Sequence, residues 1–527
     1  DYLTEHNLVE KNLLHNYIYK KYFYERVHPI VELKVFFGHL KFDRILINYG
    51  DYFYLLHKDS FYKKIRYYSL PLFAKFNNGN YAFNYVYTKK AFFFIRSYLI
   101  SVYKILRFSF SQSTSLNAKL LVATQFKQSF VSDSLYSIDK SDIDYILIDP
   151  ATSTLYSKDG DKISHLYNLN IRDIIKSIKG IYDAYSEFAI TYPRNLSLNL
   201  HIIEKSKDIF FLRQIINKSG IKVIYTCYEG SPIINILNLL GYKSNDVVSA
   251  CSMWSLGYKP EFLNELYKGA DIFFSWGEKH NINYLDCKSP FRSLVKVGYL
   301  GDYAIDYMKN KSEHDIERLI NSGNKVIAVY DNVAFLDYLI TYSQLNNFFQ
   351  GVLDALEEGS YACVIKTKFS AMHKNVDKKL VDRILKYSHK VVVMDEKSDL
   401  SPAFKSDFVY AFHQSSLGNI ASIWGKKTIF YDESSFIDNR MISKNSIIIS
   451  SSDEFIPAMK ALENFSPKID KNSFIDPFVD SKAQDRITEY IQSLLCSKDT
   501  FKSSIIKDSN ILYKLQHGDD KVLEKEG

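Results

Sequence analysis

The chain has 527 residues, which is too long for one hydrophobic core and predicts two or three domains. Hydrophobic residues make up 46% and charged residues 24%, as is typical of a folded soluble protein. The net charge of +7 fits an anionic partner such as a nucleotide, a phospholipid surface or a lipid pyrophosphate, and the charge is too dispersed for a nucleic-acid-binding protein. Five scattered cysteines without CxxC spacing argue against a disulfide framework and a zinc site, and they predict free thiols in a reducing cytoplasm.

The first 200 residues contain few clear elements. The opening DYLTEHNLVEKNLLH carries early charges and no long apolar run, so no secretory signal is predicted. FDRILINYG (42–50) has the pattern of a buried strand that ends in a glycine turn. Residues 91–108 are apolar but include three basic side chains, whereas a membrane-spanning helix needs about 20 mostly uncharged residues. A buried amphipathic helix is therefore favoured there, with a helix at a membrane surface as the alternative.

A strand and a hairpin are predicted after residue 145, and from about 208 short apolar strands alternate with amphipathic helices. YILIDP (145–150) predicts a strand, and STLYSKDGDKIS predicts a hairpin after it. Further strands are predicted at 222–230, 246–253, 271–277 and 294–301, with helices at 210–220, 232–241 and 259–270 between them. Strands that are apolar throughout and separated by such helices indicate a parallel sheet covered on both faces.

A polar helical segment at 303–323 predicts a connector, after which the alternation starts again. Strands are predicted at 325–331, 361–368, 390–396, 407–413, 427–432 and 446–452, and helices at 335–357, 376–388, 416–424, 453–463 and 483–495. The predicted fold class is α/β, with two tandem Rossmann-like, doubly wound parallel-sheet domains that face a cleft. We place the domains at residues 1–310 and 311–480, followed by a C-terminal helix and polar tail at 481–527. Ligands of such sheets bind outside the carboxyl ends of the strands.

The most specific motif is HQSSLGNIASIWG, which follows a strand and begins a helix. Ser415 or Ser416 suits the N-cap of that helix, whose first amides and dipole form a site for an anion. His413 and Gln414 lie beside the two serines at the end of the strand. A plain serine cap is the alternative explanation. The small residue Gly418 favours close packing of the helix on the sheet.

Polar side chains also follow the other strands of the second unit. Lys366 and Lys368 end one strand and could hold a pyrophosphate or a carboxylate. Four further residues at strand ends are candidates for contacts with the nucleotide or sugar: Asp331, Asn332, Asp395 and Glu396. A solvated strand end is the alternative for each of them.

In the first unit, Glu229 lies at a turn from a strand to a helix. A carboxylate there could act as a general base on an acceptor hydroxyl, or it could simply cap the helix. Trp254 and Trp276, in the loops after the next two strands, suit stacking against a sugar or ordinary packing.

Several well-known motifs are missing from the sequence. We find no GxGxxG after a strand, no Walker A sequence, no HExxH and no GxSxG. These absences argue against a nicotinamide oxidoreductase, a P-loop NTPase, a zincin and an α/β-hydrolase. Asp142 and Asp144 form a DxD pair, but the pair precedes a strand, so no metal site and no cofactor is predicted.

Taken together, VIKTK, VVVMDE, HQSSLGNIASIWG and GKKTIFYD resemble the donor-binding half of GT-B glycosyltransferases. The subset they resemble makes bacterial surface polysaccharides and includes capsule Kdo transferases and teichoic-acid glycerophosphate polymerases. IDPFVDSKAQDRITEYIQSLL (475–495) is also similar to the C-terminal end of such proteins, with Ser481 where glycine is expected. The resemblance covers roughly 220–495. It implies that Ser415 and Ser416 contact the phosphates of a donor, with the two lysines of VIKTK nearby.

The resemblance implies a cytoplasmic, metal-independent glycosyltransferase that acts in the synthesis of a capsule, an O-antigen or a related polysaccharide. The expected partners are a nucleotide-sugar donor and a glycan or lipid-linked glycan acceptor, with peripheral contact to the inner membrane and no nucleic acid. One alternative is a CDP-polyol phosphotransferase of the teichoic-acid type. Another is a non-catalytic protein of polysaccharide assembly. A nucleotide-sugar epimerase is a smaller alternative, because one fold can carry several functions.

Overall fold

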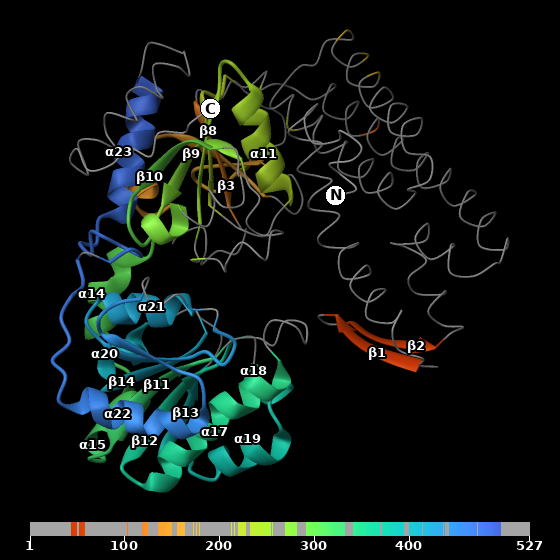
Figure 1. Ribbon diagram of the computed structural model, residues 1–527. Coiled ribbons are helices and arrows are strands. Elements are labelled where there is room, and N and C mark those ends of the chain that lie inside the picture. The colour runs from red at the N-terminus through yellow and green to blue at the C-terminus, as the bar shows by residue number, and fades with distance from the viewer. Residues whose placement is uncertain are drawn as a thin grey trace, which may run out of the picture.

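The computed structural model describes the chain in segments (Figure 1). They are residues 44–49, 52–57, 118–124, 135–149, 155–163, 220–227, 232–253, 269–281, 291–331, 341–368, 371–394, 400–413, 415–435, 442–471 and 473–496, with single positions at 103, 172, 175, 179, 212, 216, 256 and 437. Strand β1 (Arg44–Tyr49) pairs antiparallel with β2 (Tyr52–His57), which confirms the strand predicted at 42–50. The segment 91–108 lies outside the described residues except for Tyr103. Among the described residues, no helix is long and apolar enough to cross a membrane.

The first sheet contains eight strands among the described residues, in the order β10-β9-β8-β7-β3-β4-β5-β6. The strands are β3 (Leu120–Thr124), β4 (Tyr145–Ile148), β5 (Leu155–Ser157), β6 (Lys162–Ile163), β7 (Val223–Cys227), β8 (Val248–Ser252), β9 (Ala270–Ser275) and β10 (Phe291–Lys296). Every pair from β10 to β4 is parallel, and β5 and β6 form the predicted antiparallel hairpin. The sequence predicted these strands except β3, which lies in the middle of the sheet.

The second sheet contains six parallel strands among the described residues, in the order β13-β12-β11-β14-β15-β16. The strands are β11 (Lys325–Tyr330), β12 (Tyr361–Lys366), β13 (Val391–Met394), β14 (Phe408–Phe412), β15 (Lys427–Tyr431) and β16 (Ser446–Ile449). All six were predicted from the sequence. Two parallel sheets of this kind confirm the predicted fold class of tandem Rossmann-like α/β domains.

Helices cover both faces of the second sheet, as its apolar strands require. On one face Ile327, Cys363 and Tyr410 pack against four helices: α17 (Tyr342–Glu358), α18 (Ala371–Asn375), α19 (Lys378–Leu385) and α22 (Phe455–Glu463). The short helix η6 (Ser452–Glu454) directly precedes α22. On the other face the same strands pack against α15 (His314–Asn321), α20 (Ser401–Lys405) and α21 (Ser416–Ile423). Each strand therefore contributes alternate side chains to two separate cores.

The first sheet is likewise flanked by helices on the described part of the chain. α11 (Pro232–Lys243) packs on β7, β8 and β9, and Gly241 is needed there because a Cβ would lie 2.7 Å from Ser249 Cβ. α8 (Tyr136–Lys140) packs against α23 (Ala483–Cys496), the last helix among the described residues. Tyr490 of α23 meets Phe274 edge to face, with the ring centroids 5.4 Å apart. Helix α23 follows the second domain along the chain and packs on the first.

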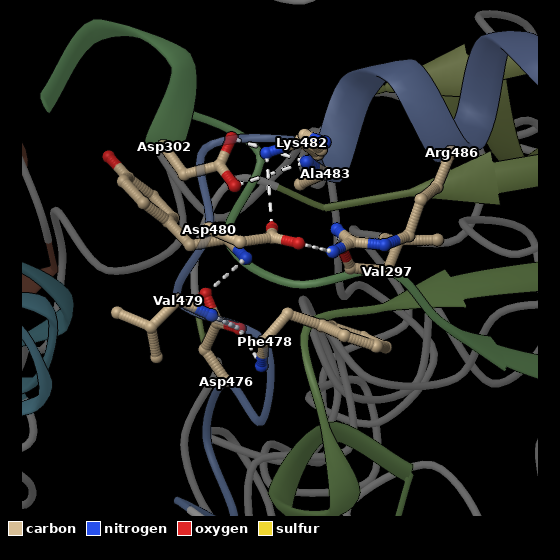
Figure 2. A network of polar contacts seen from close by, with 10 residues as sticks. Val297, Asp302, Asp476, Phe478, Val479, Asp480, Lys482, Ala483 and Arg486 are labelled. Atoms are coloured by element: carbon tan, nitrogen blue, oxygen red, sulfur yellow. Dashed lines mark hydrogen bonds and ion pairs between the residues drawn. The ribbon is translucent and has the colours of Figure 1, made fainter. Parts of the chain in front are cut away.

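The described part of the chain crosses between the domains twice, through η3 (Asp302–Ala304) and α14 (Ile305–Asn310), and back through residues 473–482. Buried carboxylates tie the two crossings together (Figure 2). Asp476 accepts a hydrogen bond from the amide of Tyr299 at 2.9 Å, and Asp302 accepts one from the amide of Ala483 at 3.1 Å. Arg486 donates to the carbonyl of Val297 at 2.8 Å. These contacts join the start of α23 to the loop after β10.

Candidate functional site

The order of the second sheet has a switch point between β11 and β14. Along the chain the strands run outward from β11 to β13, and β14 then starts on the other side of β11 and runs outward to β16. In open parallel sheets the crevice for a ligand lies at the carboxyl ends of the two strands at this point. Asp331 follows β11 and His413 follows β14, so both of these predicted residues lie at the switch point.

The start of α21 carries the predicted serine pair. Ser415 is the N-cap, and its hydroxyl accepts a hydrogen bond from the amide of Gly418 at 3.4 Å. Helix geometry leaves the amides of Ser416 and Leu417 without an acceptor inside the helix, and the helix dipole adds partial positive charge there. This helix start can therefore bind an anion with two backbone donors and the serine hydroxyls.

Gly418 explains how α21 comes so close to the carboxyl edge. A Cβ at this position would lie 2.6 Å from Ala411 Cβ on β14 and 2.9 Å from the Phe430 ring on β15. Only glycine allows the first turn to lie directly on these strands. The close packing predicted from the sequence for Gly418 is confirmed.

The end of β12 is held to Asp331 by hydrogen bonds. One oxygen of the Asp331 carboxylate accepts from the Thr367 hydroxyl at 2.7 Å, and the other accepts from the amide of Lys368 at 2.5 Å. Burial raises the pKa of Asp331 to about 6, and the two donors act in the opposite direction. Lys366 is buried and Lys368 is exposed. Asp331 thus fixes the loop that begins after Lys366, the last residue of β12, and carries Lys368.

His413 is paired with a residue that the sequence did not single out. Its Nδ1 lies 3.7 Å from Oδ1 of Asp432, and only 1% of either side chain is exposed. The proximity follows from the parallel pairing of β14 with β15, which places the ends of the two strands side by side. The sequence predicted Asp432 only as the end of a strand. Knowledge that β14 and β15 are neighbours would have identified it as the partner of His413.

The first domain touches the serine pair directly. The amide of Leu256 donates to the hydroxyl oxygen of Ser416 at 3.3 Å. The segment before Leu256 is anchored by Trp276, whose indole Nε1–H donates to the carbonyl of Met253 at 2.8 Å. In Figure 1, α21 lies on the side of the second domain that faces the first. Because Ser416 Oγ accepts from Leu256, its own proton remains to donate to an anion.

Five predicted site residues lie outside the described residues: Glu229, Asn332, Asp395, Glu396 and Gln414. β7, the strand before Glu229, ends at Cys227 and lies next to β3 at the switch point of the first sheet. The roles of these five residues stay predictions. Within the described part of the chain, no group of three or more histidine, cysteine or acidic side chains is arranged to hold a metal ion.

The chain is similar in structure to several solved proteins. A Staphylococcus aureus MnaA structure with UDP has 14% identity and a TM-score of 0.43, over 71% of this chain and 96% of that one. UDP-GlcNAc 2-epimerase from Methanocaldococcus jannaschii has 14% identity and a TM-score of 0.44, over 71% and 99%. The wall teichoic acid polymerase TagF, soaked with CDPG, has 11% identity and a TM-score of 0.41, over 77% and 97%. Neither a protein-family model nor a curated protein matches the sequence.

Proposed function

We propose that the chain is a glycosyltransferase that moves a sugar from a nucleotide-activated donor to a growing surface glycan. One observation supports the donor half of this proposal above all. The start of α21, with Ser415 and Ser416, lies at the carboxyl edge of β14, beside the switch point of the second sheet. A parallel α/β sheet binds nucleotides at such a point, and a helix start there suits their phosphates.

In this proposal the donor phosphates bind the first turn of α21, with Lys366 and Lys368 nearby. The leaving nucleotide gains negative charge as the sugar departs, and the helix dipole, the amides and the lysines would stabilise that charge without a metal ion. Asp331, Asn332, Asp395, Glu396 and Gln414 are proposed to contact the nucleotide or sugar. Glu229 is the proposed base for the acceptor hydroxyl, because it follows a strand at the switch point of the first sheet.

The acceptor is proposed to be a glycan, free or lipid-linked, that approaches the first domain from the cytoplasmic face of the inner membrane. The net charge of +7 favours contact with an anionic lipid carrier or headgroup surface. A CDP-polyol phosphotransferase would use the same phosphate site with a different donor, so it is the second candidate.

The test is a panel of CMP-, CDP-, UDP- and GDP-linked donors, with binding measured by calorimetry and turnover by the nucleotide released. One group of donors should bind, and Ser416→Ala should weaken that binding about tenfold, as expected for the loss of one hydrogen bond to a charged group. Asp377→Ala is the control for loss of a polar side chain at another helix start, because Asp377 caps α19, which has the same length as α21. It should leave donor affinity unchanged.

The panel also separates the alternatives. Release of CMP from a CDP-polyol, with no reaction of any nucleotide-sugar, would replace the glycosyltransferase with the phosphotransferase. Failure of every nucleotide to bind would contradict both enzymes and favour a non-catalytic protein of polysaccharide assembly.

A further inference from the structure

A buried imidazole–carboxylate pair lies directly before the proposed phosphate site. His413 and Asp432 follow the ends of β14 and β15, with Nδ1 and Oδ1 at 3.7 Å. This distance exceeds that of a hydrogen bond, so the contact is electrostatic. Inside the protein the effective dielectric constant is low, and such a contact is stronger than it would be in water.

The backbone holds both members of the pair in place. His413 has a φ of +48°, in the left-handed region that non-glycine residues rarely adopt, and its amide donates to the carbonyl of Tyr431 at 2.9 Å. The Asp432 amide donates to the Ile449 carbonyl at 2.8 Å, and its Oδ2 accepts from the Ile437 amide at 2.6 Å. The direction of Oδ1 is therefore fixed by contacts that do not involve the histidine.

The left-handed turn at His413 also leads the chain into α21. Only Gln414 separates His413 from the N-cap, Ser415. Strained backbone of this kind is kept where the surrounding structure requires it, often at a functional site. The pair is therefore joined by a short and constrained stretch of backbone to the amides that would bind a phosphate.

The charges around His413 favour a neutral imidazole with a particular tautomer. Burial lowers its pKa to about 4, while Asp432 and then Glu433 act to raise it. The Glu433 carboxylate also accepts from the Tyr431 hydroxyl at 2.8 Å, and on the opposite neighbour of β14 the Asp331 carboxylate is bound to the loop after β12. A carboxylate facing Nδ1 favours a proton on Nδ1, which leaves Nε2 to accept a second proton.

We propose that Asp432 is a positioning residue that holds His413 in the Nδ1–H tautomer, so that the imidazole takes up a proton from solvent at Nε2 when donor phosphates bind the first turn of α21. This inference rests on the proposed function. The bound anion stabilises the imidazolium, so the complex binds more protons than the free protein. Donor affinity should therefore increase as the pH falls, by up to about tenfold for each pH unit between the pKa of the complex and that of the free protein.

Calorimetry in two buffers of different ionisation enthalpy measures the protons taken up on binding. UDP-glucose and CDP-glycerol are suitable probes, because each of their phosphates has only one, strongly acidic ionisation. The phosphates therefore stay fully charged in the assay and do not themselves take up protons. The wild type should take up a fraction of a proton at about pH 6, and His413→Gln and Asp432→Asn should take up none. His389→Gln, at an exposed histidine, is the matched control and should behave like the wild type.

A second measurement needs no ligand and no variant. Nitrogen-15 shifts of His413 in the free wild-type protein should show the proton on Nδ1. A proton on Nε2, or equal proton uptake by wild type and His413→Gln, would overturn the inference and leave the proposed function intact. If no nucleotide-linked donor binds the wild type, the proposed function itself fails, and the inference fails with it.

Discussion

The buried carboxylate of Asp302 accepts a hydrogen bond from the start of α23, and it predicts how the stability of this contact depends on pH. Burial raises its pKa from 3.8 to about 7, because the nearby amide of Ala483 and the Arg486 charge offset only part of the desolvation. The folded protein therefore keeps a proton that the unfolded chain loses between these two pH values. The free energy of unfolding must fall as the pH rises from about 4 to about 7, by up to about 4 kcal/mol for this group.

Asp302→Asn should remove the part of this dependence that Asp302 contributes. Asparagine stays neutral and can still accept a hydrogen bond from the amide of Ala483, so the start of α23 keeps its partner. Asp476 retains a dependence in the same direction, because burial also raises its pKa. The local free energy of opening of α23 is measured by hydrogen exchange of peptides from 483–496 at several pH values, corrected for intrinsic exchange.

Asp306→Asn is the control for this experiment, because Asp306 lies on α14, exposed, four residues further along the chain. It should leave the pH dependence unchanged. If Asp302→Asn and the wild type lose the same free energy between about pH 4 and pH 7, the assignment of the buried charge to Asp302 is refuted.

Two further predictions concern the second domain. Gly418→Ala should lower the free energy of unfolding by about 1–3 kcal/mol, because the new Cβ would lie 2.6 Å from Ala411 Cβ. Denaturant titration measures this free energy, and an unchanged midpoint would contradict the close packing of α21. Thr367→Val should cost about 1–3 kcal/mol and weaken donor binding, since it removes a partner of both the Asp331 carboxylate and the Met372 amide. Unchanged stability and donor affinity would show that Asp331 holds the loop after β12 without the Thr367 hydroxyl.

Much of the fold could be predicted because its strands are continuous apolar runs between helices. The six strands of the second sheet were all predicted, since each is bounded by glycine, charged residues or a helix start. β3 was missed, because LLVAT is an apolar run of only five residues, too short for periodicity to distinguish a strand from a helix. α20 was missed because it is five residues long and contains a proline in its first turn.

The candidate site was only partly predictable for a different reason. Ser415 and Ser416 are recognisable locally, because a cap must directly precede its helix. The contact of His413 with Asp432 depends on which strands are neighbours in the sheet. The contact of Ser416 with Leu256 joins residues of different domains that are 160 positions apart in the sequence. Neither follows from local sequence patterns, since the order of strands and the docking of domains are set by packing of the whole chain.

A crystal structure of the protein with a bound nucleotide-sugar from the panel would test the central claim most directly. The account predicts that the diphosphate lies against the amides of Ser416 and Leu417, between the carboxyl ends of β11 and β14. A nucleotide bound elsewhere, with the start of α21 making no contact to its phosphates, would contradict the account.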